Sequence, residues 1–134
     1  MSALKGLKGM HHLALQVKDV RRSKAFYEEI FGMHVVWQPD EHNVYLSSGS
    51  DNLALHEDTS GAAVPSGAQY LDHLGFIIDS IDSVKELENA FRAKEVTIVK
   101  PFKHHRDGSA SFYCADPDGI VIQVLYEPHL SPSP

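Results

Sequence analysis

The chain has 134 residues, 43% of them hydrophobic and 22% charged, which is typical of a globular domain that buries roughly two-thirds of its unfolded surface. A net charge of −6 argues against a nucleic-acid partner, which would require a basic face. The single Cys114, a first segment (MSALKGLKGM) without an apolar signal core, and the absence of an apolar run of roughly 20 residues argue against a secreted or membrane protein. We therefore expect a cytoplasmic protein.

The first half of the chain is predicted to form a strand, a helix and three further strands. The stretch HLALQV, residues 12–17, alternates apolar and polar residues as a strand does. Asp19 is a candidate N-cap, and apolar residues then recur at helical spacing until Gly32, a plausible helix end. Three short strands follow, separated by turn-forming sequences: HVVWQ (34–38), NVYLSS (43–48) and LALHE (53–57).

The second half repeats this order. HLGFII (73–78) predicts a strand, and Ser80 is a candidate N-cap for a helix that extends to about Lys94. VTIVK (96–100) predicts a strand that Pro101 should end, since proline cannot donate to a sheet. Two more strands flank the turn sequence DPDG: SASFYCA (109–115) and IVIQVLY (120–126).

The two halves indicate an internal repeat of about 60 residues, because His12 and His73 begin matching strands and lie 61 positions apart. We predict a single domain over residues 9–127, with a first module at 9–58, a linker at 59–69 and a second module at 70–127. The linker is small, polar and rich in glycine, and residues 128–134 form a tail that is expected to fray.

The segments HHLALQVKD, HLGFIID and SFYCADPDGIVIQVLYEP resemble the vicinal oxygen chelate superfamily, over about residues 9–127. That superfamily includes glyoxalase I, bleomycin and fosfomycin resistance proteins, and extradiol dioxygenases. The resemblance implies an α+β fold in which two paired βαβββ modules enclose a cavity with their curved mixed sheets. It also implies metal ligands on the first and last strands of the modules, a small-molecule substrate and a homodimer.

Two histidines are the first candidate metal ligands. Strand periodicity places His12, Ala14 and Gln16 on one face, and His73, Gly75 and Ile77 on the matching face of the second module. If a pseudo-two-fold axis relates the modules, His12 and His73 face each other across the cavity. Neutral imidazole suits Fe, Mn, Ni and Zn alike. The alternative is that both are structural strand histidines.

Gln123 is the third candidate ligand. By resemblance it occupies the last-strand position at which the family carries glutamate. Glutamine offers only a neutral carbonyl oxygen, so we expect one divalent metal ion (Fe, Mn, Ni or Zn) bound more weakly than by a carboxylate. The alternative is a polar cavity residue that does not touch metal.

Another ligand position of the family falls at Ala54, on the strand LALHE. His56 lies one pleat later on the same face and could complete the site if the register is shifted, while Glu57 would point outward. We therefore include His56 among the candidate substrate-binding residues.

The sequence KHHRDGSASFY, residues 103–113, resembles a stretch of the extradiol dioxygenases in which a histidine precedes a tyrosine by nine positions. By this resemblance Tyr113 and His104 are catalytic candidates, with Tyr113 orienting or protonating a substrate oxygen. His105 and Trp37 are candidate substrate-binding residues. The alternatives are a core tyrosine, an exposed polar loop and an aromatic residue packed under a helix.

Two functions follow from these observations. The first is a metal-dependent enzyme, a dioxygenase or lyase, in which a divalent ion chelates vicinal oxygens of a small substrate. The second is a metal-free protein that sequesters a small molecule or drug, as bleomycin resistance proteins do. The acidic composition fits the second function, and the histidine pair fits the first.

Overall fold

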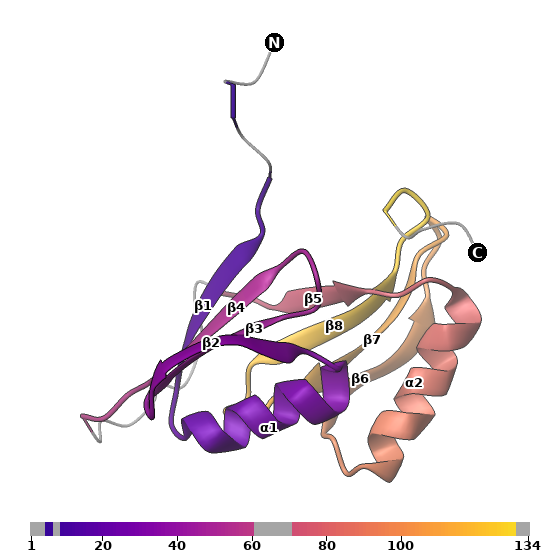
Figure 1. The fold of residues 1–134 in the computed structure, drawn as a ribbon. Coiled ribbons are helices and arrows are strands. Elements are labelled where there is room, and N and C mark those ends of the chain that lie inside the picture. Colours follow the sequence, from indigo (N-terminus) through magenta and orange to yellow (C-terminus); the bar gives the residue numbers. More distant parts are fainter. Residues whose placement is uncertain (1–4, 7–8, 61–70, 131–134) are drawn as a thin grey trace. The chain divides into compact units, whose positions relative to one another are not determined.

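The computed structural model describes residues 5–6, 9–60 and 71–130, and it divides into two compact units, Met1–Ala63 and Val64–Pro134 (Figure 1). Each unit contains one helix and one mixed four-stranded sheet, so the predicted α+β class is confirmed. The units are described separately below.

The first unit has the predicted β-α-β-β-β order. Its sheet runs β1-β4-β3-β2, with β1 parallel to β4 and the other neighbours antiparallel. The helix contacts the two central strands, β3 and β4. The elements are β1 (His12–Val17), α1 (Val20–Phe31), β2 (His34–Asp40), β3 (Asn43–Ser47) and β4 (Asn52–Glu57).

Both predicted ends of α1 are confirmed. The Asp19 side chain accepts hydrogen bonds from the backbone N–H groups of Arg21 and Arg22, at 3.1 and 3.2 Å. Gly32 ends the helix in the left-handed region at φ 65°, where a Cβ would be strained. Alternate strand residues and one side of the helix form the core: Leu15, Val17, Tyr27, Val44, Leu46, Leu53 and Leu55.

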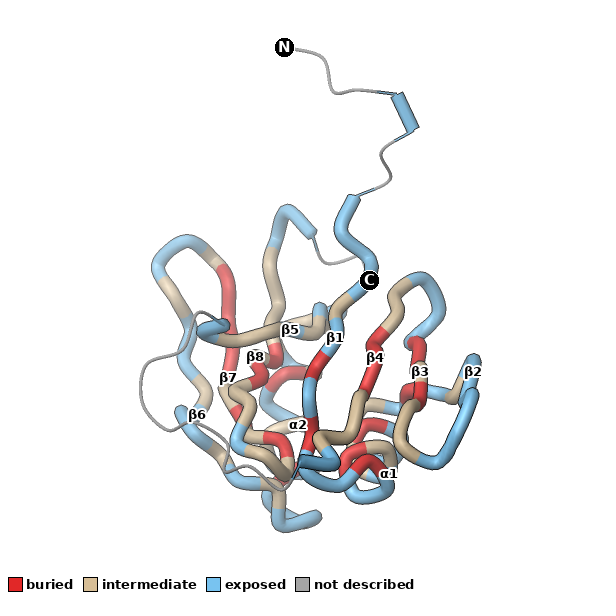
Figure 2. Tube along the Cα trace, turned by 90° about the vertical axis from the view of Figure 1, so that its left-hand side faces the viewer, coloured by how far each residue is buried: buried red, intermediate tan, exposed pale blue. Residues whose placement is uncertain are grey.

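The second unit repeats this plan, with a sheet in the order β5-β8-β7-β6 and β5 parallel to β8. Ser80 caps α2 by accepting from the backbone N–H of Ser83 at 3.0 Å. Phe91 of the helix meets Phe112 of the sheet edge to face, with ring centroids 5.4 Å apart. Figure 2 shows that buried residues concentrate on the central strands. The elements are β5 (Leu74–Ile77), α2 (Ile81–Ala93), β6 (Ile98–His104), β7 (Ala110–Ala115) and β8 (Val121–Tyr126).

The C-terminus of α2 differs from that of α1. The N–H of Val96 donates to the Phe91 carbonyl and the N–H of Glu95 to the Arg92 carbonyl, both at 3.0 Å, which is the Schellman pattern. Glu95 adopts the left-handed conformation, at φ 63°. A glutamate therefore occupies a backbone position that is usually filled by glycine.

The prediction that Pro101 ends a strand is wrong, because β6 continues through it to His104. The strand lies at the edge of its sheet, and its pairing with β7 is irregular between Lys100 and Lys103. An edge position and a bulge both remove the need for a backbone donor. Pro39 has an equivalent place in the edge strand β2, beside a second irregularity.

Residues 61–69 of the predicted linker and 131–134 of the predicted tail lie outside the described residues. Among those that are described, no helix is long and apolar enough to span a membrane.

Candidate functional site

His12 lies on the face of the first sheet that points away from the core. It pairs with Asn52 across the parallel β1–β4 ladder, and its Nδ1 atom is 2.8 Å from Asn52 Oδ1. Because a carbonyl oxygen only accepts, Nδ1 carries the proton and the lone pair is on Nε2. A neighbour that fixes the tautomer in this way is typical of metal-ligating histidines.

His56 lies further along the same face. Its Nδ1 is 2.6 Å from Asn43 Oδ1, and Asn43 is oriented because its Nδ2 donates to Asp40 at 2.9 Å. His56 follows Asn52, the partner of His12, by four residues on β4, which is about 13 Å along a strand. In this register His56 is therefore not beside His12.

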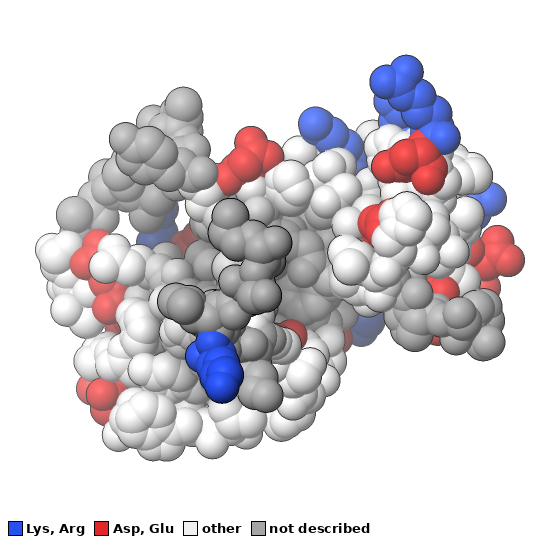
Figure 3. All heavy atoms as spheres, turned by 90° about the horizontal axis from the view of Figure 1, so that it is seen from above, with Lys and Arg blue, Asp and Glu red and all other residues white. Residues whose placement is uncertain are grey.

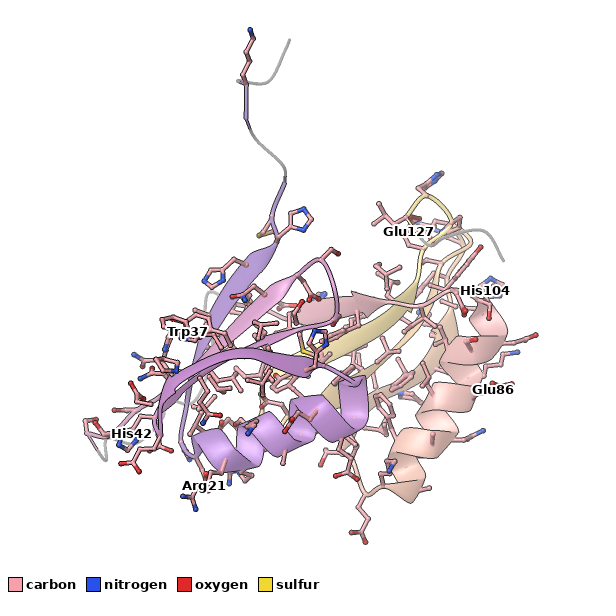
Figure 4. The ribbon with its side chains drawn as sticks, viewed as in Figure 1. Arg21, Trp37, His42, Glu86, His104 and Glu127 are labelled. Atoms are coloured by element: carbon pink, nitrogen blue, oxygen red, sulfur yellow. The ribbon has the colours of Figure 1, made fainter. Side chains whose placement is uncertain are left out.

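His56 instead ends an aromatic row. Its ring meets that of Tyr45 edge to face at 5.8 Å, and Tyr45 is tilted against Trp37 at 5.0 Å. Trp37 is 59% exposed on β2 (Figure 4). The two predicted substrate-binding residues of this unit, Trp37 and His56, thus share one aromatic surface.

Glu57 belongs to a structural clamp near the start of α1. Its carboxylate accepts from the backbone N–H of Val20 at 2.9 Å and from His42 Nδ1 at 2.8 Å. The Val20 N–H, and then His42, lower the pKa of Glu57, and the hydrogen bond to Glu57 raises the pKa of His42. Glu57 therefore holds the β2–β3 turn to the helix.

In the second unit, His73, Tyr113 and Gln123 form a cluster. Asp72 accepts from His73 Nδ1 at 2.6 Å, which leaves the Nε2 lone pair free, and the His73 ring meets Tyr113 edge to face at 5.4 Å. Tyr113 pairs with Gln123 between β7 and β8, and Gly75 pairs with Gln123 from β5. A Cβ on Gly75 would lie 3.8 Å from the Gln123 Cβ, so glycine leaves space beside this side chain.

Gln123 is held by a residue that the sequence analysis did not select as a site residue. Its Nε2 donates to Ser111 Oγ at 3.2 Å, and the same hydroxyl is 3.1 Å from His105 Nε2. Ser111 is 1% exposed. The signal that could have found it is strand register, because Ser111 and Tyr113 share a face that is adjacent to Gln123.

Four predicted residues line one open pocket of about 670 Å³ in the second unit: His104, His105, Tyr113 and Gln123. The same pocket is lined by Lys103, Arg106, Asp107 and Ser109. Figure 4 shows His104 near the start of α2, on the side of the unit where β6 ends.

The charge around this pocket is positive. Lys103 and Arg106 outnumber Asp107, whose pKa is lowered by its hydrogen bonds to Ser109. Lys100 adds a further cation, with its Nζ 5.2 Å from the centroid of the Tyr113 ring. Lys103, Arg106 and Lys100 thus form a cationic rim in a chain whose net charge is −6. Acidic and basic side chains are interspersed on the face drawn in Figure 3. Such a rim suits an anionic ligand.

The donor set is compatible with a divalent metal. Two imidazoles with free Nε2 lone pairs and an amide oxygen are ligands that first-row metals accept. Within the described ranges no three His, Cys, Asp or Glu side chains form a group that could hold a metal ion, and the predicted set has glutamine as its third member. His12 belongs to a different unit from His73 and Gln123, so their convergence stays a prediction.

The repeated βαβββ units with matching histidines correspond to a known family. Residues 9–124 match the model of the Glyoxalase/Bleomycin resistance protein/Dioxygenase superfamily. The chain belongs to this superfamily.

Several members of the superfamily are similar over most of the chain. Glutathione transferase FosA of Serratia marcescens is 30% identical over 88% of this chain and 80% of its own length. The uncharacterized protein YaeR of Escherichia coli is 34% identical over 91% of this chain and 98% of its own. The crystal structure of lactoylglutathione lyase from Agrobacterium tumefaciens superposes with a TM-score of 0.75 at 25% identity, covering 94% of this chain and 98% of that one.

Proposed function

We propose that this superfamily member binds one divalent metal ion through His12, His73 and Gln123, and acts as an enzyme on a small anionic substrate with neighbouring oxygens. The observation that carries the proposal is the cluster of the second unit. There, His73 has its Nδ1 occupied by Asp72, and Tyr113 and Gln123 border the cationic pocket. His12 has the same tautomer, which supports an equivalent role.

The metal, when bound, would act as a Lewis acid that holds and polarises the substrate oxygens. The chain's own residues would do the rest. Lys103 and Arg106 would attract and orient the anionic group. Among the described residues, no hydrogen-bond partner is found for the Tyr113 hydroxyl, so it can donate to a substrate oxygen. His104 at the pocket margin is the candidate to carry a proton.

Gln123 departs from the family pattern for every reaction of the family, because glutamate is the family residue at this position. Non-haem iron oxygenases depend on two histidines and one carboxylate, so this departure argues against orthodox ring cleavage without separating a lyase from a transferase. We favour a lyase or transferase reaction on the names of two relatives. The names of FosA, a glutathione transferase, and of lactoylglutathione lyase are consistent with this choice.

The positive rim also bears on the alternative, a metal-free protein that sequesters a drug. Lys103 and Arg106 would repel a cationic drug from this pocket. The same rim would attract an anionic drug as well as an anionic substrate. The charge of the pocket therefore does not separate the two functions, and metal binding is the property to measure.

The test is the metal content of protein purified without a histidine tag, followed by calorimetric titration with Mn²⁺, Fe²⁺, Ni²⁺ and Zn²⁺. We expect His12→Ala and His73→Ala to weaken binding at least tenfold, because each removes a ligand nitrogen. Gln123→Glu should strengthen binding, because an anionic oxygen replaces a neutral one. His34→Ala, at an exposed position of β2, serves as the control and should bind as the wild type does.

Equal affinity for the wild type and His12→Ala would mean that the histidine pair is structural. The metal-free binding function would then be the better explanation of the pocket.

A further inference from the structure

His56, at the end of the aromatic row of the first unit, has no part in the proposed metal site. It lies four residues beyond Asn52 on β4, which is too far along the strand for His56 to share a metal ion with His12. Its ring is half-buried, and its Nε2 atom has no hydrogen-bond partner among the residues that the structure describes. The chemistry of this nitrogen is determined by two neighbouring residues.

Asp40 and Asn43 are those neighbours. The Asp40 carboxylate accepts from Asn43 Nδ2, at 2.9 and 3.1 Å from its two oxygens, and from the backbone N–H of His42 at 2.8 Å. The N–H of His42, and then the amide of Asn43, lower the pKa of Asp40. The carboxylate is therefore ionised and can only accept hydrogen bonds. It follows that the NH₂ group of Asn43 faces Asp40 and that its Oδ1 faces His56.

This arrangement leaves a single tautomer for His56. Asn43 Oδ1 is 2.6 Å from His56 Nδ1, and because a carbonyl oxygen has no proton to give, Nδ1 must donate. In the neutral imidazole the lone pair is then on Nε2. The opposite orientation of the amide would place Asn43 Oδ1 against the Asp40 carboxylate, and two acceptors repel each other. His56 Nε2 is thus a fixed hydrogen-bond acceptor.

The surface around this acceptor favours one kind of ligand. The Tyr45 ring meets that of His56 edge to face at 5.8 Å and is tilted against Trp37 at 5.0 Å, so a planar ring finds aromatic partners beside Nε2. A metal ion would find too few ligands, because the described ranges contain no group of three His, Cys, Asp or Glu side chains. The Asp40 carboxylate is already occupied by two donors, so the row does not require a cationic ligand.

We propose that the surface formed by Trp37, Tyr45 and His56 binds a planar, uncharged aromatic molecule whose hydroxyl or N–H group donates to His56 Nε2. Asn43 and Asp40 are positioning residues, because they act through His56. The site lies within the first unit and needs no metal ion, so it goes beyond the proposed function.

Two probes of similar shape test the hydrogen bond. Phenol carries a hydroxyl group, and in anisole a methyl group replaces its proton. The single tryptophan, Trp37, belongs to the proposed surface, so its fluorescence and its indole resonance report binding to the metal-free, full-length chain. We expect phenol to change both signals, and unchanged signals would overturn the proposal.

The ratio of phenol affinity to anisole affinity isolates the contribution of the acceptor. His56→Phe keeps an aromatic ring but has no acceptor, and it should lower this ratio about fivefold, the usual contribution of one hydrogen bond. Trp37→Ala should weaken both probes alike and leave the ratio unchanged, because it removes only ring contact. An equal ratio in the wild type and in His56→Phe would refute the role of Nε2, and a loss confined to phenol in Trp37→Ala would refute the ring surface.

Asp40→Asn tests the positioning. An amide at this position can donate as well as accept, so it no longer fixes the orientation of Asn43. The ring ¹⁵N resonances of His56 at pH 8 should show the lone pair on Nε2 in the wild type and a mixture of tautomers in Asp40→Asn, with a lower affinity ratio. A lone pair on Nδ1 in the wild type would overturn the proposal without any probe.

Glu41→Gln is the matched control. It removes the same charge from the same turn, but Glu41 pairs with His42, with Oε1 3.3 Å from Nε2. We expect its affinity ratio to stay within about twofold of the wild type, as for most surface substitutions. A loss equal to that of Asp40→Asn would mean that charge, and not the orientation of Asn43, is responsible. No titration in this series contains a metal ion, so its outcome is independent of the test of the proposed function.

Discussion

Glu95, the left-handed residue after α2, allows a prediction about stability. Gly32, at the equivalent position after α1, provides the comparison. Glu95 has φ 63° and Gly32, after α1, has φ 65°. A left-handed conformation costs a residue with a Cβ roughly 1–2 kcal/mol, whereas glycine loses roughly 0.5–1 kcal/mol more in chain entropy on folding. The difference predicts that Glu95→Gly stabilises the protein by about 0.5–1 kcal/mol.

The reverse change at the equivalent position should have the opposite sign. A Cβ added at Gly32 meets no atom within 4 Å, so the cost of Gly32→Ala is that of the backbone alone, about 1 kcal/mol. For a chain of this length these values correspond to shifts in Tm of roughly 2–5 °C in either direction.

Urea unfolding of the two variants, together with Glu95→Ala, measures these effects. Glu95→Ala removes the carboxylate but keeps the Cβ, so it should gain little. If Glu95→Gly were no more stable than Glu95→Ala, the stability of this helix end would not depend on backbone strain, and the reasoning would fail.

Three further predictions concern the clamp, the thiol and the core. His42→Ala should flatten the pH dependence of the urea midpoint between pH 6 and 8. The hydrogen bond to Glu57 raises the pKa of His42 in the folded protein above its value in the unfolded chain. The stability that protonated His42 contributes is therefore complete below the unfolded pKa of about 6.5 and is lost as the pH rises through the folded pKa. A midpoint curve identical to that of the wild type would exclude the clamp. Burial raises the pKa of Cys114 to about 12, so a disulfide reagent at pH 8 should label it only in urea, and fast labelling of native protein would contradict its burial. Phe112→Ala should cost about 3–5 kcal/mol in unfolding free energy, against less than about 0.5 kcal/mol for Val99→Ala on the surface; similar values for both would show that Phe112 is not a core residue.

Much of each unit could be predicted because its signals are local. Asp19, Ser80 and Gly32 mark helix ends through contacts that span a few residues, and these predictions are confirmed. The alternation in residues 12–17 likewise identified β1 with its correct bounds. Such signals depend on neighbouring residues and not on the rest of the fold.

Two features of the second unit were not predicted. A proline interrupts a central strand but is tolerated in an edge strand, and the position of β6 in its sheet is not a local property of the sequence around Pro101. Glu95 takes a left-handed conformation that glycine usually fills, and the two Schellman hydrogen bonds close the helix end around it. Neither arrangement could be inferred from the residue type.

The candidate site likewise has a part that was predicted from the sequence and a part that was not. His104, His105, Tyr113 and Gln123 were predicted from the resemblance to the family, and they line one pocket of the second unit. The partners that orient the candidates, Asn52 and Ser111, depend on strand register, which only pairing across the sheet determines. The meeting of His12 with His73 depends on the relation between the two units, and strand periodicity does not specify that relation.

The prolines in the two edge strands have a consequence for self-association. Pro39 in β2 and Pro101 in β6 each remove a donor from a strand border that would otherwise offer a row of unpaired backbone groups to another chain. Both borders also have irregular pairing, which disturbs the flat template that fibrillar aggregation requires. The equivalent edge strands of the two units are thus both protected against the addition of strands from other chains. The expected homodimer should form through surfaces other than these two borders.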